Sequence, residues 1–399
     1  MTDQSSLRER DFKKILLIKL SALGDVVHTI PVLNKLRRRY PDARIDWLVT
    51  PGIAELLQHN PAISHVVEFP RAEWSEPWRP APYVSTARLI AQLRSAEYDL
   101  VIDLQGQLRS AVFAFASGAP VRVGFDKPRP DAFTSLSRII PEEARKHAWK
   151  GAREGSWLAY TDCIALPTLD VHPVERYLGI GPMLGLDDGP ADFSFPIPPE
   201  AAVRIEGLLD YYEIAKSRIA VIAPGTIWET KQWRADGFGE AARHLLKQKL
   251  AVVLVGSESE RGLCEEIAKS APGVVNLAGE TSLSELAALL SRAALCVTND
   301  SGPMHLAVAL RRSVVSVFGP TDPVWAGPYR QPDSVVRAGV PCSPCYLRRL
   351  RECPNRHVCM TTVNASAVIA PVDAILAKQQ ARTSARPTAG SANSRPPRR

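Results

Sequence analysis

Hydrophobic runs of strand length alternate with amphipathic stretches along the first half of the chain. Apolar or β-branched runs predict buried strands, and apolar positions recurring at helical spacing predict the helices between them. The predicted strands span residues 14–20, 44–49, 65–69, 98–103 and 121–124, and the predicted helices span 26–40, 51–60, 84–96 and 108–116. We expect residues 70–83 to form an irregular loop and residues 125–170 to contain helical pieces. Such alternation is typical of a parallel sheet covered by helices on both faces.

A second alternating series follows a stretch rich in Gly, Pro and Asp. Its predicted strands span 218–223, 250–255, 274–277, 295–298 and 313–318, and its helices 236–248, 259–270, 283–292 and 304–310. We therefore predict an α/β chain with two facing, doubly wound domains and a cleft between them. The predicted organisation is an N-terminal extension at 1–13, a first domain at 14–184, a linker at 185–199, a second domain at 200–378 and a disordered tail at 379–399.

Polar loops follow two neighbouring strands of the second series. Asp300, Ser301 and Gly302 come after one strand, and residues 319–323 come after the next. The carboxyl ends of parallel strands share one sheet edge, where open α/β sheets bind ligands. Ser301 is the predicted cap of a helix whose free N–H groups favour an anion such as a diphosphate, with His305 close by. A capped turn without a ligand is the simpler alternative.

Composition and charge exclude several classes of protein. Five of the basic residues behind the net charge of +7 are arginines of residues 379–399, which hold no acid, so the rest of the chain carries only +2. A dedicated nucleic-acid-binding domain would show a basic face within its fold. Neither domain has a dinucleotide fingerprint or a Walker loop. Without a membrane-length apolar run or a secretory signal, we expect a cytoplasmic protein.

Six short motifs, in order along both halves, resemble glycosyltransferase family 9, the lipopolysaccharide heptosyltransferases. They read KLSALGDVVHTIP at 19–31, DLQGQLRS at 103–110, PGT at 224–226, KQW at 231–233, DSGPMH at 300–305 and GPTDP at 319–323. The resemblance runs from about residue 14 to about residue 370 and implies a GT-B fold of two Rossmann-like domains. It also implies metal-independent, inverting transfer of a heptose from an ADP-sugar to a lipid-linked inner-core acceptor, with no cofactor required.

The resemblance implies partners as well. They are an ADP-sugar donor, an anionic glycolipid acceptor of the lipid A/Kdo type, and the inner face of the cytoplasmic membrane as a peripheral contact, with no nucleic acid. The family's members of type I and type II differ in their acceptor, and the chain has features of both, so the sequence leaves the acceptor open.

Inverting transfer needs a base for the acceptor hydroxyl and stabilisation of the departing diphosphate. Asp25 falls on the family's catalytic carboxylate, at a helix start that favours its ionised form; an ordinary helix cap is the alternative. The resemblance also assigns Ser21 and Arg129 to the acceptor. It assigns the donor to Thr226, Lys231, Glu260, Asp300, Ser301, Gly302 and His305. Lys231 would meet the diphosphate unless it is only a solvated surface lysine, and Glu258 competes with Glu260 for the ribose.

Four cysteines gather near the end of the second domain. Cys342, Cys345, Cys353 and Cys359 could hold one structural zinc ion, although their spacing is not the commonest zinc pattern. Free thiols in a reducing cytosol and a disulfide pair are the alternatives. Similar clusters occur in heptosyltransferase II-like members, whereas the first half of the chain looks more like heptosyltransferase I.

Two other functions remain open at this point. A nucleotide-sugar 2-epimerase of the same fold would release nucleotide without an acceptor. A non-catalytic protein could bind a nucleotide sugar, or an anionic surface through its basic tail. Asp25 after Gly24, together with the loop from Asp300 to His305, favours sugar transfer.

Overall fold

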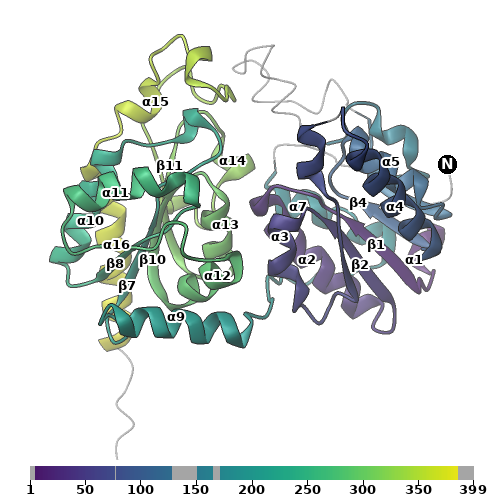
Figure 1. The fold of residues 1–399 in the computed structure, drawn as a ribbon, viewed down its shortest axis with the longest axis horizontal. Helices are drawn as coiled ribbons and strands as arrows, with labels where there is room; N and C mark the ends of the chain where they lie inside the picture. Colours follow the sequence, from purple (N-terminus) through teal and green to yellow (C-terminus); the bar gives the residue numbers. More distant parts are fainter. Residues whose placement is uncertain (1–4, 77, 128–150, 165–170, 385–399) are drawn as a thin grey trace, which may run out of the picture.

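The computed structural model describes residues 5–76, 78–127, 151–164 and 171–384 and contains two parallel six-stranded sheets (Figure 1). The first sheet has the order β3-β2-β1-β4-β5-β6. Its strands are β1 (Lys14–Ile18), β2 (Arg44–Val49), β3 (His65–Glu68), β4 (Leu100–Asp103), β5 (Val121–Phe125) and β6 (Asp162–Ile164). All five predicted strands in this half lie within two residues of their predicted ends.

Helices cover both faces of the first sheet. Separate apolar cores lie on its two sides, and β1 contributes Ile15 and Leu17 to one and Leu16 and Ile18 to the other, as expected for a strand buried on both faces. The helices are α1 (Ser5–Arg8), α2 (Leu23–Arg39), α3 (Pro51–Gln58), η1 (Arg71–Ser75), α4 (Ala81–Ser95), α5 (Leu108–Ala116), η3 (Ser156–Ala159), α7 (Pro173–Leu178) and α8 (Gly181–Leu184).

The second sheet repeats the topology of the first, with the order β12-β11-β10-β7-β8-β9. Its strands are β7 (Ile219–Ala223), β8 (Ala251–Leu254), β9 (Val275–Asn276), β10 (Ala293–Asn299), β11 (Ser313–Phe318) and β12 (Val335–Arg337). The helices are α9 (Pro199–Tyr211), η4 (Glu229–Lys231), α10 (Ala235–Lys247), η5 (Glu258–Glu260), α11 (Arg261–Ser270), α12 (Leu283–Arg292), α13 (Gly302–Ala309), α14 (Pro323–Ala326), η6 (Pro332–Ser334), η7 (Leu350–Glu352), α15 (Val358–Thr361) and α16 (Ala365–Ser384).

Strand order explains where a site can form. In each sheet the order reverses between two central strands, β1 and β4 in the first and β7 and β10 in the second. Helices leave opposite faces at such a switch point, so a crevice opens beyond the carboxyl ends of the two strands. The loops after β1 and β4 and those after β7 and β10 carry five of the six sequence motifs.

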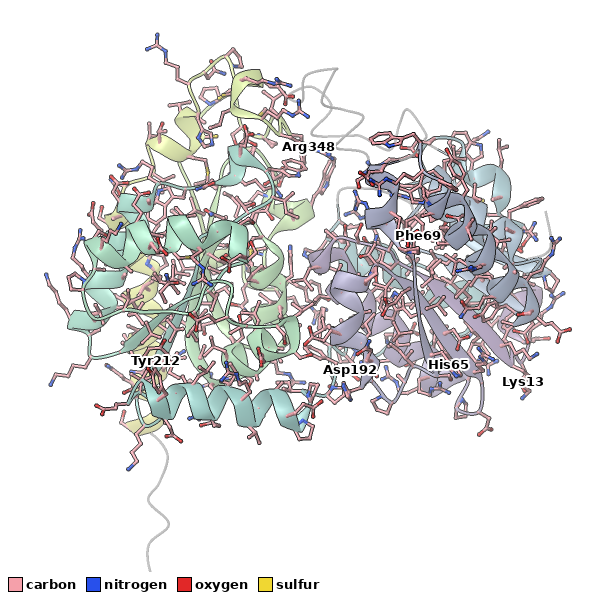
Figure 2. All side chains as sticks on the ribbon, viewed as in Figure 1. Lys13, His65, Phe69, Asp192, Tyr212 and Arg348 are labelled. Carbon is pink, nitrogen blue, oxygen red and sulfur yellow. The ribbon has the colours of Figure 1, made fainter. Side chains whose placement is uncertain are left out.

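The two halves contact each other directly. Helix α13 packs against α2, and Glu55 of α3 accepts hydrogen bonds from the Ser282 hydroxyl (2.6 Å) and the Ser284 amide (3.1 Å) at the start of α12. The linker continues this contact along α2, where Lys35 Nζ donates to Asp187 (2.7 Å). Figure 2 shows Asp192 of the same linker beneath the gap between the halves. None of the helices in the described part of the chain is long and apolar enough to cross a membrane.

Several elements differ from the sequence predictions. Strand β6 lies in a region predicted to be helical, and β12, α9 and α16 were not predicted at all. The predicted loop at 70–83 contains η1 and the first turn of α4. The predicted tail at 379–399 begins too early, because α16 continues to Ser384 and Gln379 Nε2 donates to Ala294 O (2.8 Å). Residues 385–399 and Arg129 lie outside the described residues.

Candidate active site

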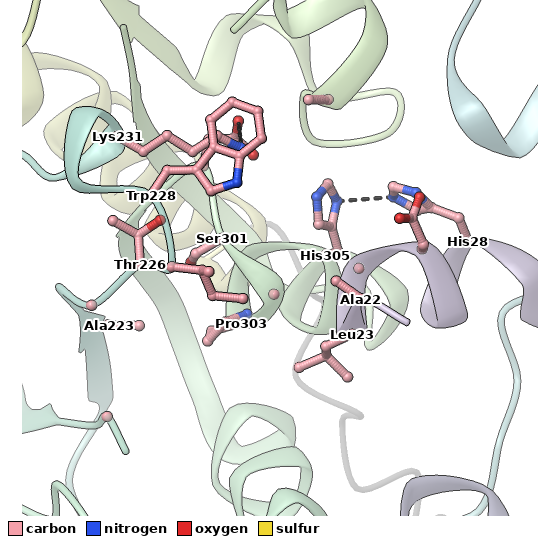
Figure 3. Close-up of a pocket in the computed structure, with 18 of the residues that line it drawn as sticks. Ala22, Leu23, His28, Ala223, Thr226, Trp228, Lys231, Ser301, Pro303 and His305 are labelled. Atoms are coloured by element: carbon pink, nitrogen blue, oxygen red, sulfur yellow. Dashed lines mark hydrogen bonds and ion pairs between the residues drawn. The ribbon is translucent and has the colours of Figure 1, made fainter. Parts of the chain in front are cut away.

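A cavity of about 340 Å³ lies between the two halves, at the carboxyl edges of both sheets (Figure 3). The first half contributes Asp25 and His28 from α2 and Pro173 from α7. The second half contributes all seven predicted donor residues, which are Thr226, Lys231, Glu260, Asp300, Ser301, Gly302 and His305. The tertiary structure therefore brings the predicted base and the predicted donor residues to one place.

Asp25 lies in the first turn of α2, after the N-cap Ala22, and its side chain is 42% exposed. Tyr177 donates its hydroxyl proton to Asp25 Oδ1 (2.9 Å), and Lys19 Nζ donates to the Tyr177 oxygen (2.8 Å) and to Leu104 O (2.8 Å). An ammonium group can only donate, so the Tyr177 hydroxyl must accept from Lys19 and give its own proton to Asp25. Burial raises the pKa of Tyr177 well above its usual value, which keeps that proton in place.

Lys231 is an ion-pair partner and not a solvated surface lysine. Its Nζ lies 2.6 Å from Asp300 Oδ2 and 4.4 Å from the centre of the Trp228 ring. The Thr321 hydroxyl donates to the same Asp300 oxygen (2.6 Å), and Asp300 is buried. These contacts hold the Lys231 ammonium group beyond the carboxyl end of β7. A diphosphate bound there could contact this ammonium group while Asp300 remains paired with it.

Helix α13 begins as predicted at Ser301, with Pro303 in its first turn. The Ser301 hydroxyl makes no capping bond to a helix amide and instead lies 3.0 Å from Thr298 Oγ1. The amides of the first turn are therefore left without this side-chain acceptor, which suits a helix start that binds an anion. A Cβ added to Gly302 would come within 2.8 Å of Leu23 Cδ2, so glycine lets α13 approach α2 closely.

Glu260 and not Glu258 faces the cavity. Glu260 Oε2 accepts hydrogen bonds from the amide (2.7 Å) and the hydroxyl (2.9 Å) of Ser257, so the residue also closes the turn before α11. Glu258 instead pairs with Arg261 (2.8 Å) on the surface. The structure therefore places Glu260 and not Glu258 in the cavity wall, and the binding of the ribose by Glu260 stays a prediction.

Two histidines that the sequence analysis did not assign accompany His305 between the halves. His28 Nε2 lies 2.9 Å from His305 Nδ1, a contact drawn in Figure 3, and the His28 and His172 rings are 4.8 Å apart. Burial lowers the pKa of His28 well below its usual value, and lowers that of His172 to about 3 and that of His305 to about 4. All three rings are therefore neutral at pH 7. His28 lies within the first motif, which was the available signal.

The remaining predicted residues have mixed outcomes. Ser21 lies next to the cavity-lining Ala22, and its hydroxyl accepts from Arg71 Nη1 (3.5 Å). The four clustered cysteines have free thiols, and burial raises the pKa of Cys359 to about 12. Among the residues that the structure describes, no group of three or more His, Cys, Asp or Glu side chains is placed to hold a metal ion. The arrangement of these side chains thus lends the zinc site no support, and zinc stays a prediction.

Comparisons with known proteins agree with this geometry. The model of the family "Glycosyltransferase family 9 (heptosyltransferase)" matches residues 86–355. Lipopolysaccharide heptosyltransferase 1 of Pseudomonas aeruginosa is 29% identical over 382 residues, which cover 91% of this chain and 98% of that protein.

Two solved structures are similar along nearly the whole chain. A glycosyl transferase family 9 protein from Veillonella parvula has a TM-score of 0.71 at 18% identity, covering 92% of this chain and 98% of that one. E. coli heptosyltransferase WaaC with ADP-2-deoxy-2-fluoro heptose has a TM-score of 0.66 at 23% identity, covering 90% and 99%. These similarities confirm the predicted GT-B fold. The motifs, the shared cavity and the family match lead to one conclusion: this chain is a glycosyltransferase and belongs to glycosyltransferase family 9.

Proposed function

We propose that the chain transfers a heptose from ADP-heptose to the lipid-linked inner core of lipopolysaccharide, with inversion at the anomeric carbon. The proposal is supported by the heptosyltransferases to which the chain is similar, one of which was solved with an ADP-heptose analogue. The observation that carries it is the single cavity that joins Asp25 to the Lys231–Asp300 pair and the start of α13. Base and leaving-group stabiliser thus face one reaction space from opposite halves.

The reaction can be followed atom by atom. Asp25 accepts the proton of an acceptor hydroxyl while that oxygen attacks the anomeric carbon of the heptose. The bond between the anomeric carbon and the diphosphate oxygen breaks, and ADP carries the electron pair away. Lys231 and the amides at the start of α13 stabilise the charge that develops on the diphosphate. Tyr177 donates a hydrogen bond to Asp25 Oδ1 and so orients the carboxylate for the acceptor hydroxyl.

The remaining donor residues have complementary roles in this proposal. Thr226 offers a hydroxyl to the phosphates, and Glu260 accepts from the ribose hydroxyls with the oxygen that does not bond Ser257. Ser21 precedes Asp25 by four residues, and its hydroxyl accepts a hydrogen bond from Arg71. We assign it to the acceptor. Arg129 is kept as an acceptor residue on the resemblance alone.

The test is a transfer assay with ADP-heptose and a lipid A/Kdo-type acceptor. Asp25→Asn keeps the shape of the side chain and removes the base, so turnover should fall by about 100-fold or more while donor affinity stays unchanged. Lys231→Ala should weaken donor binding in calorimetry and also slow transfer. Near-normal turnover of Asp25→Asn would remove Asp25 from the mechanism, and unchanged donor affinity and turnover of Lys231→Ala would remove Lys231 from the donor site.

The acceptor requirement separates this proposal from its alternatives. A transferase releases ADP in step with the glycosylated acceptor, whereas a 2-epimerase of the same fold releases free nucleotide without any acceptor. A non-catalytic binding protein would do neither. ADP release measured with and without the acceptor therefore distinguishes all three, and no observation on the molecule favours the second or the third.

We further propose that the transfer needs no cofactor and that any zinc is purely structural. The support for zinc is the sequence of the four cysteines within residues 342–359. Elemental analysis of protein purified without chelator should then show about one zinc per chain, bound by four thiolates with no open position for water. Metal-free protein with full activity and four titratable thiols would leave the free-thiol alternative standing.

Peripheral contact with the inner face of the cytoplasmic membrane is proposed for the α4–α5 side of the first half. Four exposed apolar side chains belong to this part of the first half: Trp78 (76%) in the turn before α4, Tyr83 (55%) on α4, Phe115 (65%) on α5 and Leu158 (82%) on η3, which packs against α5. Sedimentation with anionic vesicles should be lost in a Trp78→Ser/Phe115→Ser variant. A matched Tyr211→Ser variant on α9 should still sediment, and equal binding by both variants would contradict the placement.

A further inference from the structure

The least expected side chain near the cavity is that of Arg176. It is only 1% exposed, yet its Nε and Nη1 atoms have no hydrogen-bond partner among the described residues. Buried guanidinium groups are normally paired with a carboxylate or with several carbonyls. An unpaired one loses its hydration without gaining hydrogen bonds in return, which costs free energy. An unpaired buried cation in a folded enzyme calls for a partner that arrives with a ligand.

The position of Arg176 identifies which ligand. Arg176 lies on α7, one turn after the cavity-lining Pro173 and directly before Tyr177, which bonds Asp25. Helix α7 packs against α2, which carries Asp25. Burial lowers the pKa of Arg176, whereas the charges of Tyr177, Asp25 and Tyr346 raise it, and Tyr346 belongs to the second half. Arg176 is not one of the residues that line the cavity, so its guanidinium lies behind the cavity wall, within the electrostatic influence of Asp25 from the first half and Tyr346 from the second.

Three cationic side chains share the electrostatic influence of Asp25. Burial lowers the pKa values of Lys19, Arg153 and Arg176, and the Asp25 carboxylate opposes that shift in each of them. Arg153 also feels the charge of Arg348, which Figure 2 shows on the side of the second half that faces the first. Asp103 also opposes the shift in Lys19, and Glu154 opposes the shift in Arg153, whereas Asp25 is the carboxylate that acts on Arg176. A further anion beside Arg176 is therefore electrostatically favoured.

We propose that the Arg176 guanidinium is an anion subsite beside Asp25, filled by a phosphate or carboxylate group of a bound substrate. The proposal rests on the proposed function, which supplies two such groups: the diphosphate of the donor and an acidic group of the acceptor. Phosphate and carboxylate groups each present two oxygens to which a guanidinium can donate two parallel hydrogen bonds. The subsite would position the bound substrate so that its reacting group lies close to Asp25.

The test compares Arg176→Met with Arg122→Met. Replacing an unpaired buried charge with an apolar side chain removes a desolvation cost, so Arg176→Met should raise the Tm of the ligand-free protein or leave it unchanged. Arg122 donates to Ala159 O (2.7 Å) and Ala119 O (2.6 Å), so Arg122→Met should lower the Tm. A structural role for Arg176 would make the two variants alike.

Calorimetry with two probes identifies the source of the anion. ADP represents the donor diphosphate, and the free sugar acid Kdo represents a carboxylate on the acceptor. Arg176→Met should bind one of them about tenfold or more weakly than the wild type, as expected for a lost charge-assisted hydrogen bond. Weaker ADP binding assigns the subsite to the donor, and weaker Kdo binding assigns it to the acceptor.

Unchanged affinity for both probes would overturn the proposal, whatever happens to the Tm. If Arg176→Met does not fold, Arg176→Gln is measured in the same way. Both arms measure binding and not turnover, so they remain informative if heptose transfer itself is disproved by the transfer assay.

Discussion

At the scale of single residues, Tyr177 is the clearest addition to the predicted site. The sequence analysis singled out Asp25 but gave no reason to look 152 residues further along the chain for its partner. The Tyr177 hydroxyl accepts from Lys19 and donates to Asp25 Oδ1, so the direction of both hydrogen bonds is fixed. We infer that Tyr177 is a positioning residue, which orients the carboxylate and favours its charged form.

Tyr177→Phe should lower kcat by roughly tenfold and move the acid limb of the pH–kcat/KM profile to higher pH, because a hydrogen bond to the carboxylate is lost. Tyr98→Phe is the matched control, since Tyr98 also donates to a buried carboxylate, Asp46 Oδ2 (2.6 Å), away from the cavity. Its pH profile should be unshifted. A Tyr177→Phe profile that superimposes on the wild type would leave Tyr177 with packing alone.

At the scale of elements, α16 changes the boundary of the second domain. Its last turns were predicted to be disordered because residues 379–399 are rich in Ser, Pro, Ala and Arg. In the structure, Gln379 joins this helix to the sheet, accepting from Arg218 Nη2 (2.8 Å) and donating to Ala294 O (2.8 Å). The prediction of disorder from composition was wrong for residues 379–384. The hydrogen bonds of Gln379 join residues far apart in the sequence, so no local pattern indicates them.

Truncation tests this correction. A chain ending at residue 384 should unfold at the same temperature as the full chain and keep its activity. A chain ending at residue 378 loses the Gln379 hydrogen bonds, those with Arg218 and Ala294 among them, and should have a Tm lower by several degrees, since each net hydrogen bond contributes about 1 kcal/mol. Thermal unfolding followed by circular dichroism gives the comparison. Equal Tm values for the two truncated chains would support the predicted boundary at 378.

At the scale of the whole molecule, the contact between the halves makes the stability of the protein depend on pH. His28 and His172 from the first half meet His305 from the second, and burial lowers the pKa values of all three. The unfolded chain binds protons at these rings near pH 6.5, whereas the folded chain binds them at His305 only near pH 4 and at His172 only near pH 3, and burial lowers the pKa of His28 in the same direction. Stability is therefore complete above pH 6.5 and is lost as the pH falls toward 4.

Denaturant unfolding at pH 7 and pH 5 should show this loss, with His172 and His305 each contributing about 2 kcal/mol of the difference. His28→Gln should shrink the difference, because one of the three proton-linked rings is gone. His59→Gln removes a half-exposed histidine beside Glu200 and should leave the difference unchanged. The same pH dependence in His28→Gln as in the wild type would disprove the linkage.

The sequence by itself determined the alternation of strands and helices, the α/β class and the residues of the motifs. These are local properties: β-strand runs, helical periodicity and turn chemistry are written in neighbouring residues, so α5, α12, β2 and β11 match their predicted bounds. The short edge strands β6 and β12 were not predicted, because three residues are too few to show the hydrophobic pattern of a strand. The choice of Asp25 and Lys231 came from motif order and resemblance, which also depend on sequence alone.

Only the tertiary structure decided the strand order, the shared cavity and the pairing of distant side chains. Strand order depends on which helices cover which face of the sheet, and no single segment encodes that choice. The Tyr177–Asp25 bond, the His28–His305 contact and the orientation of Glu260 over Glu258 join residues whose relation appears only when both sheets are built. The unpaired state of Arg176 is the same kind of fact, since burial and hydrogen bonding are properties of the packed chain.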